Sequence, residues 1–291
     1  MADETAARHE LITALGLLPI PGGTVHLRDA RSGITRDEAL LPFTLGKTQL
    51  TRGMWDLVSG PTSNFTSSFP SSTATANPAV PMASAADDAG TPLALDRRPA
   101  QPLTWFDAVG WCNAASELAG LTPAYAIAGR DVFWDVDSDG FRLPTEAEWE
   151  WAARAGSTGP LYGELPDIAW TFLDSLDGPQ DVGTKEPNSF GLFDMIGNVW
   201  EWCWDYADTA RYGDYRSLRG AGWDDRPWSA RASVRRGSAP DAVLEDVGFR
   251  VARGAVGKPG TMAAQGWSAD ADRNRAAITG PRPVGWTPLR H

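Results

Sequence analysis

The sequence predicts an α+β fold with low regular secondary structure, built from short antiparallel strands and a few helices. Its 291 residues include 30 glycines and 14 tryptophans, a combination that indicates irregular loops folded over aromatic anchors. Apolar residues alternate in short runs between glycine and proline turns, which is typical of short strands. Three segments carry the capping residue and the apolar spacing of a helix.

The first of these elements are predicted near the start of the chain. Residues 15–27 and 39–45 alternate apolar and polar side chains around turn residues, so we expect them to form paired β-strands. Residues 51–59 follow as a short helix, because Met54 and Val58 recur at helical spacing behind Thr51, a typical N-cap residue.

A second helix is predicted from Thr104 through Leu118. Asp107 stands three residues after Thr104, where its side chain can complete a capping box. Gly120 supplies the stop that commonly ends a helix.

A strand is expected over residues 133–136, and a third helix follows it. Thr145 is the predicted N-cap of this helix, and Glu148 can return the hydrogen bond to the Thr145 amide. The helix is expected to run to Arg154 and to stop at Gly156.

The composition divides the chain into segments. We predict an N-terminal extension at 1–14, a domain at 15–253 that contains a long surface loop at 61–100, and an irregular tail at 254–291. The loop is rich in Ser, Thr, Ala and Pro, which bury too little surface to offset the entropy of ordering. Two tryptophans, Trp267 and Trp286, are expected to pin the tail to the domain.

The charge balance restricts the partners of the protein. The net charge is −11 and the pI about 4.7, whereas nucleic acids and anionic membranes attract basic surfaces. We therefore expect a small-molecule or peptide ligand, with neither nucleic acid nor membrane as a partner. The first ten residues carry acids rather than a basic segment, which is unlike a signal peptide, and the protein is expected to be cytoplasmic.

Several strings of the sequence, in this order and spacing, resemble the formylglycine-generating enzyme (sulfatase-modifying factor) family. The resemblance covers residues 17–253 and implies a C-type-lectin-like fold. Most of the strings have a structural interpretation, as caps, tryptophan anchors and an arginine fork at Arg142. The strings lie at 105–109, 112–113, 140–154, 188–202 and 248–251.

The resemblance also implies two cysteines that bind copper(I) between a Gly-Gly-Ser-like turn and the last string. Residues 219–236 contain no cysteine; by position Asp225 falls on the first copper cysteine, the second falls near Trp228, and Gly222 replaces the serine of the turn. Copper(I) prefers thiolate or thioether ligands. The sequence therefore represents a member that lacks the copper-binding pair and argues against copper-dependent formylglycine formation.

The remaining cysteines and histidines offer no obvious redox site. Cys112 and Cys203 lie in apolar or aromatic surroundings and are predicted to be buried free thiols. The three histidines, His9, His26 and His291, are far apart in the sequence, which argues against a three-histidine iron site.

Calcium is the metal for which the sequence supplies ligands. The resemblance implies a structural calcium site at the Gly-Asn-x-Trp-Glu string, here Asn198 and Glu201 with nearby carbonyls; the alternative is hydrogen bonding in the core. A second string matches the oxygen spacing of an EF-hand loop, although the entering helix is missing, so an acidic turn is the alternative. Its ligands would be Asp135, Asp137, Asp139 and Glu146.

Two functions follow from residues 219–236. A binding or accessory protein would use the aromatic, acidic and guanidinium groups of this segment to hold a polar ligand or an acidic peptide. An oxidoreductase that tailors a biosynthetic product would instead need a general base desolvated by tryptophan; a solvated turn is the alternative for its acids. The binding candidates are Trp223, Asp225, Arg226, Trp228, Arg231 and Arg235, and the catalytic candidates are Asp224, Asp225 and Glu201.

Overall fold

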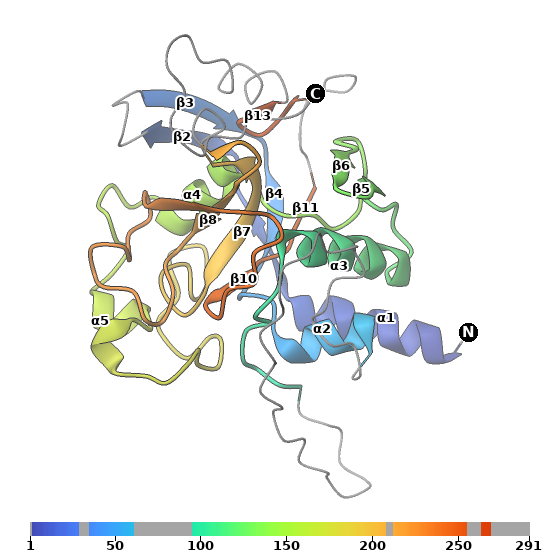
Figure 1. The fold of residues 1–291 in the computed structure, drawn as a ribbon, viewed down its shortest axis with the longest axis horizontal. Helices are drawn as coiled ribbons and strands as arrows, with labels where there is room; N and C mark the ends of the chain where they lie inside the picture. The colour runs from blue at the N-terminus through green and yellow to red at the C-terminus, as the bar shows by residue number, and fades with distance from the viewer. Residues whose placement is uncertain (1, 29–34, 61–94, 208–211, 255–262, 269–291) are drawn as a thin grey trace, which may run out of the picture.

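The protein is described here by a computed structural model that covers residues 2–28, 35–60, 95–207, 212–254 and 263–268. Short strands and a few helices alternate along the described chain, which confirms the predicted α+β class (Figure 1). Most of the predicted loop at 61–100, and Trp286 with most of the predicted tail, lie outside the described residues.

Strands near the start of the chain pair as predicted. β1 (Leu17–Ile20) pairs antiparallel with β4 (Phe43–Gly46), and β2 (Gly23–Arg28) pairs antiparallel with β3 (Thr35–Leu40). β11 (Ala252–Arg253), from the far end of the family-like region, adds to the other edge of β4. Strands from the two ends of the domain therefore lie in the same sheet.

The largest sheet has the strand order β10-β7-β8-β9 and lies at the centre of Figure 1. Its strands are β7 (Trp200–Tyr206), β8 (Arg216–Arg219), β9 (Arg235–Ser238) and β10 (Val247–Phe249). β10 runs parallel to β7, whereas the other neighbours are antiparallel. Every residue of β7 except the last is buried, so this strand lies in the core of the fold.

Helices α1 (Ala2–Leu15), α2 (Arg52–Ser59) and α3 (Trp105–Leu118) pack together on one side of the sheets (Figure 1). The caps of α2 and α3 are those expected from the sequence: the Thr51 hydroxyl accepts from the Met54 amide, and Thr104 and Asp107 form a capping box. The leucines of the last turns of α1, Leu11 and Leu15, are buried in the core.

A hairpin and a capped helix follow. β5 (Tyr125–Ala128) pairs with β6 (Asp131–Trp134), so the strand expected over 133–136 begins earlier and ends at Trp134, where the chain turns. α4 (Glu146–Arg154) has the predicted Thr145–Glu148 capping box. Ala155 in the left-handed region, with φ 43°, precedes Gly156 and ends the helix as expected.

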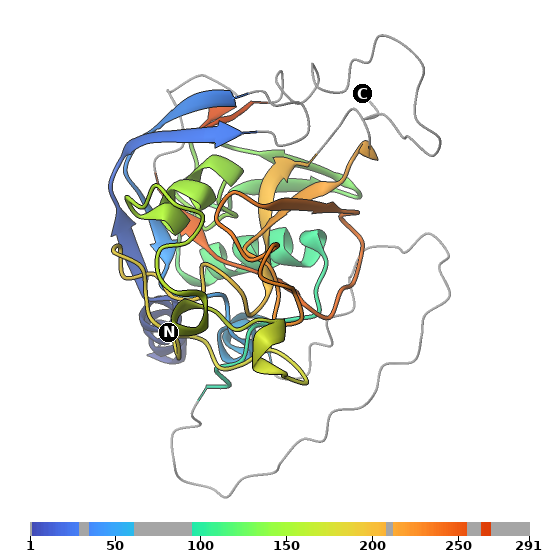
Figure 2. The ribbon, with the colours of Figure 1, turned by 90° about the vertical axis from the view of Figure 1, so that its left-hand side faces the viewer.

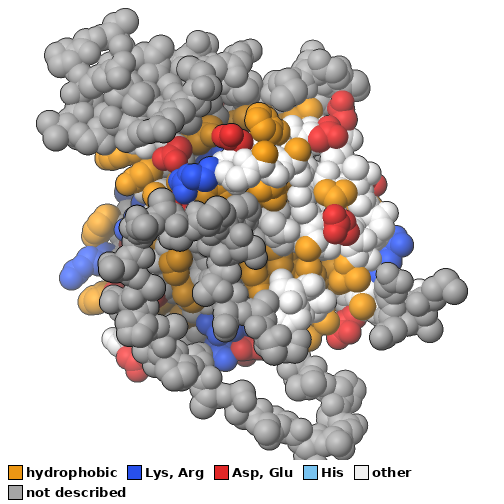
Figure 3. Space-filling model, turned by 45° about the vertical axis from the view of Figure 1, so that its right-hand side comes forward, with side chains coloured by type: hydrophobic (Ala, Val, Ile, Leu, Met, Phe, Trp, Pro, Cys, Tyr) orange, Lys and Arg blue, Asp and Glu red, His pale blue; other side chains and the backbone are white. Residues whose placement is uncertain are grey.

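Two short helical turns complete the described regular structure, α5 (Leu165–Ile168) and the 3-10 helix η1 (Phe172–Asp174). Among the described residues, no helix combines the length and the apolar character that a membrane span needs. On the face drawn in Figure 3, basic side chains are scattered among apolar and acidic ones rather than gathered in one patch.

A segment of the predicted tail returns to the core. β12 (Ala263–Ala264) and β13 (Trp267–Ser268) form a hairpin beside β3 (Figures 1 and 2). Trp267 is buried, with its ring centroid 5.6 Å from that of Trp134 and 5.4 Å from that of Trp204. Trp267 therefore anchors this part of the tail to the domain, as the sequence predicted.

Three buried arginines form ion pairs with glutamates of the strings that carry the family resemblance, and we call these pairs the buried arginine network. Arg142 pairs with Glu148 at 2.7 Å and donates to the carbonyls of Leu143 and Gly254, which is the fork expected from the sequence. Two further arginines form equally buried ion pairs with glutamates. These pairs are Arg219 with Glu146 and Glu150, and Arg250 with Glu201.

Candidate functional site

The segment that stands where the resemblance places copper is a series of turns after β8. It packs on two other loops through backbone hydrogen bonds: the Trp223 amide donates to the Asn198 carbonyl at 2.7 Å, and the Phe172 amide donates to the Asp225 carbonyl at 3.1 Å. The turns, the buried loop before β7 and η1 are therefore hydrogen-bonded into one connected unit.

Asp225 holds this turn together. One oxygen of its carboxylate, Oδ2, accepts hydrogen bonds from the Trp200 indole at 2.6 Å and from the Gly222 amide at 2.9 Å. Asp225, at the position of the first copper cysteine, is thus hydrogen-bonded to Trp200 on β7. Asp224, its neighbour, is exposed.

A third carboxylate, Asp246, lies next to these two, and the sequence analysis missed it. A Cβ built on Gly222 would stand 2.9 Å from Asp246 Oδ2, so a serine at position 222 would collide with this aspartate unless one of them moved. Partial burial raises the pKa of Asp246, and the charges of Asp225 and Asp224 raise it further against the opposing effect of Arg236. The available signal was its place directly before the Val247-Gly248-Phe249 strand.

An exposed aromatic and apolar surface lies beside the carboxylates. Trp228 is 67% exposed, and Phe172 and Leu173 of η1 are 45% and 59% exposed. The Arg226 guanidinium lies over the Phe172 ring at 4.9 Å, and a turn closed by the Ser229 amide and the Arg226 carbonyl carries Trp228. We call Phe172, Leu173, Arg226 and Trp228 the Trp228 surface. Phe172 and Leu173 come from a part of the chain where no functional string was recognised.

The other binding candidates divide between this region and the scaffold. Arg231 is exposed, and Trp223 is half-buried with an indole nitrogen that has no partner among the described protein atoms. Arg235 is a correction to the predicted ligand set: its guanidinium binds Glu146 at 2.6 Å and the Ser217 hydroxyl at 3.1 Å. Strand pairing in β9 turns Arg235 toward α4, so it braces the sheet.

Glu201, a candidate base and calcium ligand, is fully buried in an ion pair. Its two oxygens accept from Arg250 at 2.9 and 3.1 Å, and Oε2 also accepts from the Trp149 indole at 2.7 Å. A carboxylate held in this way has no open face for a substrate proton or a metal ion. The structure therefore argues against Glu201 in both roles.

Asn198 uses its polar groups to join three loops. Its side-chain oxygen accepts from the Gln180 amide at 2.8 Å and its side-chain nitrogen donates to the Gln180 carbonyl at 3.0 Å. Its backbone amide donates to the Trp170 carbonyl at 2.9 Å, and its carbonyl accepts from Trp223. In the structure Asn198 makes hydrogen bonds in the core, which is the alternative to calcium ligation.

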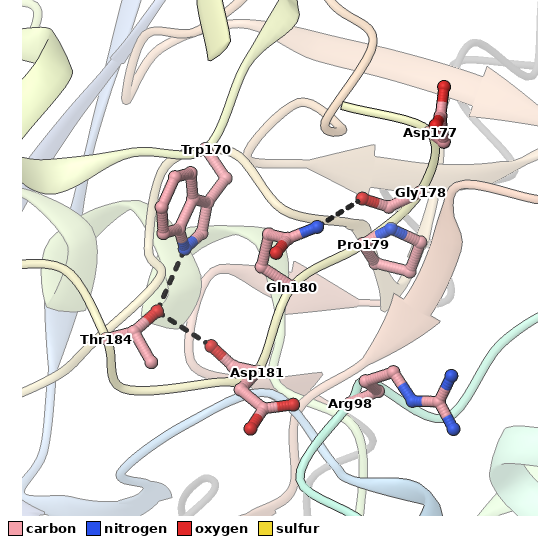
Figure 4. Close-up of a pocket in the computed structure, with 8 residues that line it drawn as sticks. All are labelled: Arg98, Trp170, Asp177, Gly178, Pro179, Gln180, Asp181 and Thr184. Atoms are coloured by element: carbon pink, nitrogen blue, oxygen red, sulfur yellow. Dashed lines mark hydrogen bonds between the residues drawn. The ribbon is translucent and has the colours of Figure 1, made fainter. Parts of the chain in front are cut away.

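One of the loops held by Asn198 borders a shallow hollow of about 590 Å³. Figure 4 shows Trp170, bonded through its indole to the Thr184 hydroxyl at 2.9 Å, on one side of the hollow and Arg98 on the other. The segment 177–181 forms the rest of the lining. Through Asn198, this hollow and the turn at Trp223 belong to one connected unit.

The structure does not bring the EF-hand-like acids together. Glu146 is buried and paired with Arg219 and Arg235, while Asp139 accepts from the Thr122 amide and lies near Arg253. The described residues contain no group of three or more His, Cys, Asp or Glu side chains that could hold a metal ion. This geometry argues against the EF-hand interpretation of the string, because its last ligand, Glu146, is already paired with two arginines, and it favours the acidic turn.

Both cysteines are buried free thiols, as predicted. Burial raises the pKa of Cys112, and burial with neighbouring carboxylates raises the pKa of Cys203. Such thiols stay protonated at neutral pH and make poor nucleophiles and poor metal ligands.

Comparison with known families and proteins gives consistent matches. The model of the family described as "Sulfatase-modifying factor enzyme 1-like domain" matches residues 3–255. "Inactive C-alpha-formylglycine-generating enzyme 2" of Bos taurus is 38% identical over 146 residues, 42% of this chain and 47% of that protein. "Chaperone protein LppX" of Paenibacillus barcinonensis is 29% identical over 197 residues, 54% of this chain and 70% of that protein. The chain thus matches about half of the length of the first of these relatives.

Solved structures support the fold. "Treponema denticola variable protein 1" superposes with a TM-score of 0.63 at 27% identity, over 81% of this chain and 94% of that one. "Crystal Structure of CarF" gives a TM-score of 0.59 at 24% identity, over 81% of this chain and 97% of that one. These matches confirm the predicted C-type-lectin-like architecture.

Proposed function

The chain belongs to the family of sulfatase-modifying factor enzyme 1-like domains, and from this premise we propose that it is a ligand- or protein-binding member rather than a sulfatase-modifying oxidase. The observation that carries the proposal is the Trp228 surface, which occupies the region where the resemblance places the copper cysteines. An aspartate bound to Trp200 and an exposed tryptophan stand there instead of thiolates.

The surface has the side chains that dominate protein recognition. Tryptophan and arginine are enriched among the residues that carry binding energy, and an aromatic ring with a neighbouring guanidinium offers both apolar and charged contacts. Arg226 and Arg231 are exposed beside Trp228. The partner that fits best is a peptide segment with a carboxylate next to an apolar or aromatic side chain.

The names of the relatives are compatible with this proposal. One is called an inactive formylglycine-generating enzyme and another a chaperone. Neither name describes oxidation as the activity of that protein. The first name supports a use of this fold without the enzyme activity, and the second supports a use as a chaperone.

Selection of peptides from a displayed random library tests the proposal. The wild-type protein is the bait, and the variants Trp228→Ala and Phe133→Ala are run in parallel; Phe133, on β6, is 61% exposed and lies outside the Trp228 surface. We expect peptides with acidic and aromatic residues to be enriched on wild type and on the Phe133 variant but lost on the Trp228 variant. Equal enrichment on all three proteins would contradict the proposal.

A direct assay addresses the oxidase reaction. A cysteine peptide from a sulfatase, incubated with the protein, copper(I), oxygen and a thiol reductant that supplies the two further electrons, should gain no formylglycine detectable by mass spectrometry. Conversion of the peptide would show that a site other than the two buried cysteines supports the family reaction.

The second candidate function is a tailoring oxidoreductase with a site that does not use cysteine. Asp246 favours it, because a half-buried carboxyl group whose pKa is raised beside Asp224 and Asp225 suits a general base better than either neighbour. Mass spectrometry of small molecules released from the purified protein, before and after exposure to oxygen, tests this function. A retained molecule that oxygen alters in wild type but not in Asp246→Asn would favour it over the binding proposal.

A further inference from the structure

The side chain of Gln49 lies fully buried inside the loop that leads to β7. Its amide nitrogen donates toward three backbone carbonyls of that loop, those of Asp194 at 3.3 Å, Gly197 at 3.3 Å and Val199 at 2.8 Å. An amide group has two N–H donors, so three oxygens surround one nitrogen that can fully satisfy only two of them.

The loop is shaped to enclose this point. Asp194, Gly197 and Asn198 all have φ in the left-handed region, at 53°, 80° and 66°. This conformation is costly for residues other than glycine, and it persists only where surrounding contacts enforce it. Here it turns the carbonyls of the loop inward onto the Gln49 nitrogen.

The carbonyl oxygens of the loop at 194–199 and the carboxylate of Glu201, at the end of the same string, are the types of ligand that a hard cation such as Ca²⁺ prefers. The family resemblance implies calcium at this string. The residues of this chain do not fit that ion, because Arg250 already neutralises Glu201 and the Asn198 side chain is committed to Gln180. Arg250 supplies positive charge and the Gln49 amide supplies donors to the carbonyls, while two buried oxygens, Gln49 Oε1 and Asp194 Oδ1, have no hydrogen-bond partner among the described protein atoms.

We infer that the Gln49 amide nitrogen occupies the cation position of this loop, and that the chain holds the loop in its folded shape without calcium. The inference goes beyond the proposed function, since it concerns how the loop behind the hollow and the Trp223 turn is held. One residue decides the type of site: an amide donates to the carbonyls, whereas a carboxylate at the same position would repel them unless a cation lay between.

The substitution Gln49→Glu therefore converts the loop into a calcium site. We expect the Tm of the wild-type protein to differ by less than about 1 °C between excess chelator and millimolar calcium. The Gln49→Glu variant should melt roughly 5 °C or more lower in chelator and regain stability in a saturable way as calcium is added. Metal analysis after dialysis should find stoichiometric calcium in the variant and none in wild type.

Two results would overturn the inference. A calcium-dependent Tm or bound calcium in the wild-type protein would show that Gln49 does not replace the ion. A folded Gln49→Glu variant that ignores calcium would show that the carbonyls do not form a cation cage.

The wild-type measurements keep the inference falsifiable if Gln49→Glu fails to fold even with calcium. Gln49→Ala adds no carboxylate and leaves Glu201 and Asn198 with their protein partners, so its Tm should fall without responding to calcium, and a calcium-dependent Tm would overturn the inference. Gln180→Ala is the matched control, because Asn198 binds only the backbone of Gln180; its Tm should not respond to calcium.

Discussion

The buried arginine network and the Trp228 surface both contain arginine, and they differ in what that arginine contacts. In the network, Arg250 binds Glu201, with no exposed surface on either side chain, and donates to the carbonyls of Gly46 on β4 and of Phe193 in the loop before β7. On the surface, Arg226 contacts the Phe172 ring and Trp228 is mostly open to solvent. The buried arginine network therefore stabilises the fold, whereas the Trp228 surface is exposed and can determine what the protein binds.

The largest effect is expected from breaking the network. Arg250→Met leaves Glu201 buried without its partner and removes donors from the Gly46 and Phe193 carbonyls. We expect a loss of about 5 kcal/mol of unfolding free energy, or failure to fold, in urea denaturation. Arg253→Met is the matched control, because the Arg253 side chain is 38% exposed, donates to the Asp139 carbonyl at 2.7 Å and lies 3.8 Å from the Asp139 carboxylate; its loss should stay below about 1 kcal/mol.

Asn198→Ala should come next, because it disconnects the hollow from the Trp223 turn. The substitution strips the Gln180 amide and carbonyl of their side-chain partners, which we expect to cost about 3 kcal/mol. Hydrogen exchange should rise most over residues 177–181, which the Asn198 side chain holds, and less over residues 222–225, which its backbone carbonyl holds. Unchanged exchange over residues 177–181 would contradict the role of the Asn198 side chain in holding this segment.

Asp194 gives a pH-dependent prediction of intermediate size. Burial raises its pKa from 3.8 to about 6, so the folded state binds a proton more tightly than the unfolded state. Its contribution to stability is therefore greatest below pH 4 and is lost as the pH rises through about 6. Asp194→Asn stays neutral and tolerates the φ of 53°, so it should gain roughly 2 kcal/mol over wild type at pH 7 and little at pH 4.

Urea denaturation of wild type and Asp194→Asn at several pH values measures this difference. Parallel stability curves for the two proteins would show that Asp194 does not titrate in this range. Asp194→Ala separates charge from hydrogen bonding, because it also removes the acceptor of the Gly183 amide.

The smallest effect on stability is expected at Trp228. With 67% of its surface exposed, Trp228→Ala should change the unfolding free energy by less than about 0.5 kcal/mol. Circular dichroism melting compares it with wild type. A large loss of stability would mean that Trp228 belongs to the core, and the contrast between the two regions would fail.

The sequence predicted the elements whose determinants are local. Thr104 and Thr145 each carry an acid three residues on, and both capping boxes are present. Trp267 packs into an aromatic cluster, as predicted, because burial of a large apolar side chain stabilises the folded state.

Features set by contacts between distant segments were missed or misassigned. The EF-hand spacing of the acids could not reveal that Arg219 and Arg235, from strands distant in the sequence, form ion pairs with Glu146. Asp246 and Phe172 joined the site only through backbone pairing of three loops. Gln49 lies about 145 positions before the carbonyls that it binds, and no local pattern marks it.

The most direct test of the account is calorimetric titration of a peptide enriched on the wild-type protein against wild type, Trp228→Ala and Phe133→Ala. We expect the Trp228 variant to keep the wild-type Tm and to lose affinity by roughly 30-fold, the effect of removing about 2 kcal/mol of binding energy. Phe133→Ala should bind as wild type does. Undiminished affinity of Trp228→Ala would contradict the assignment of binding to the Trp228 surface.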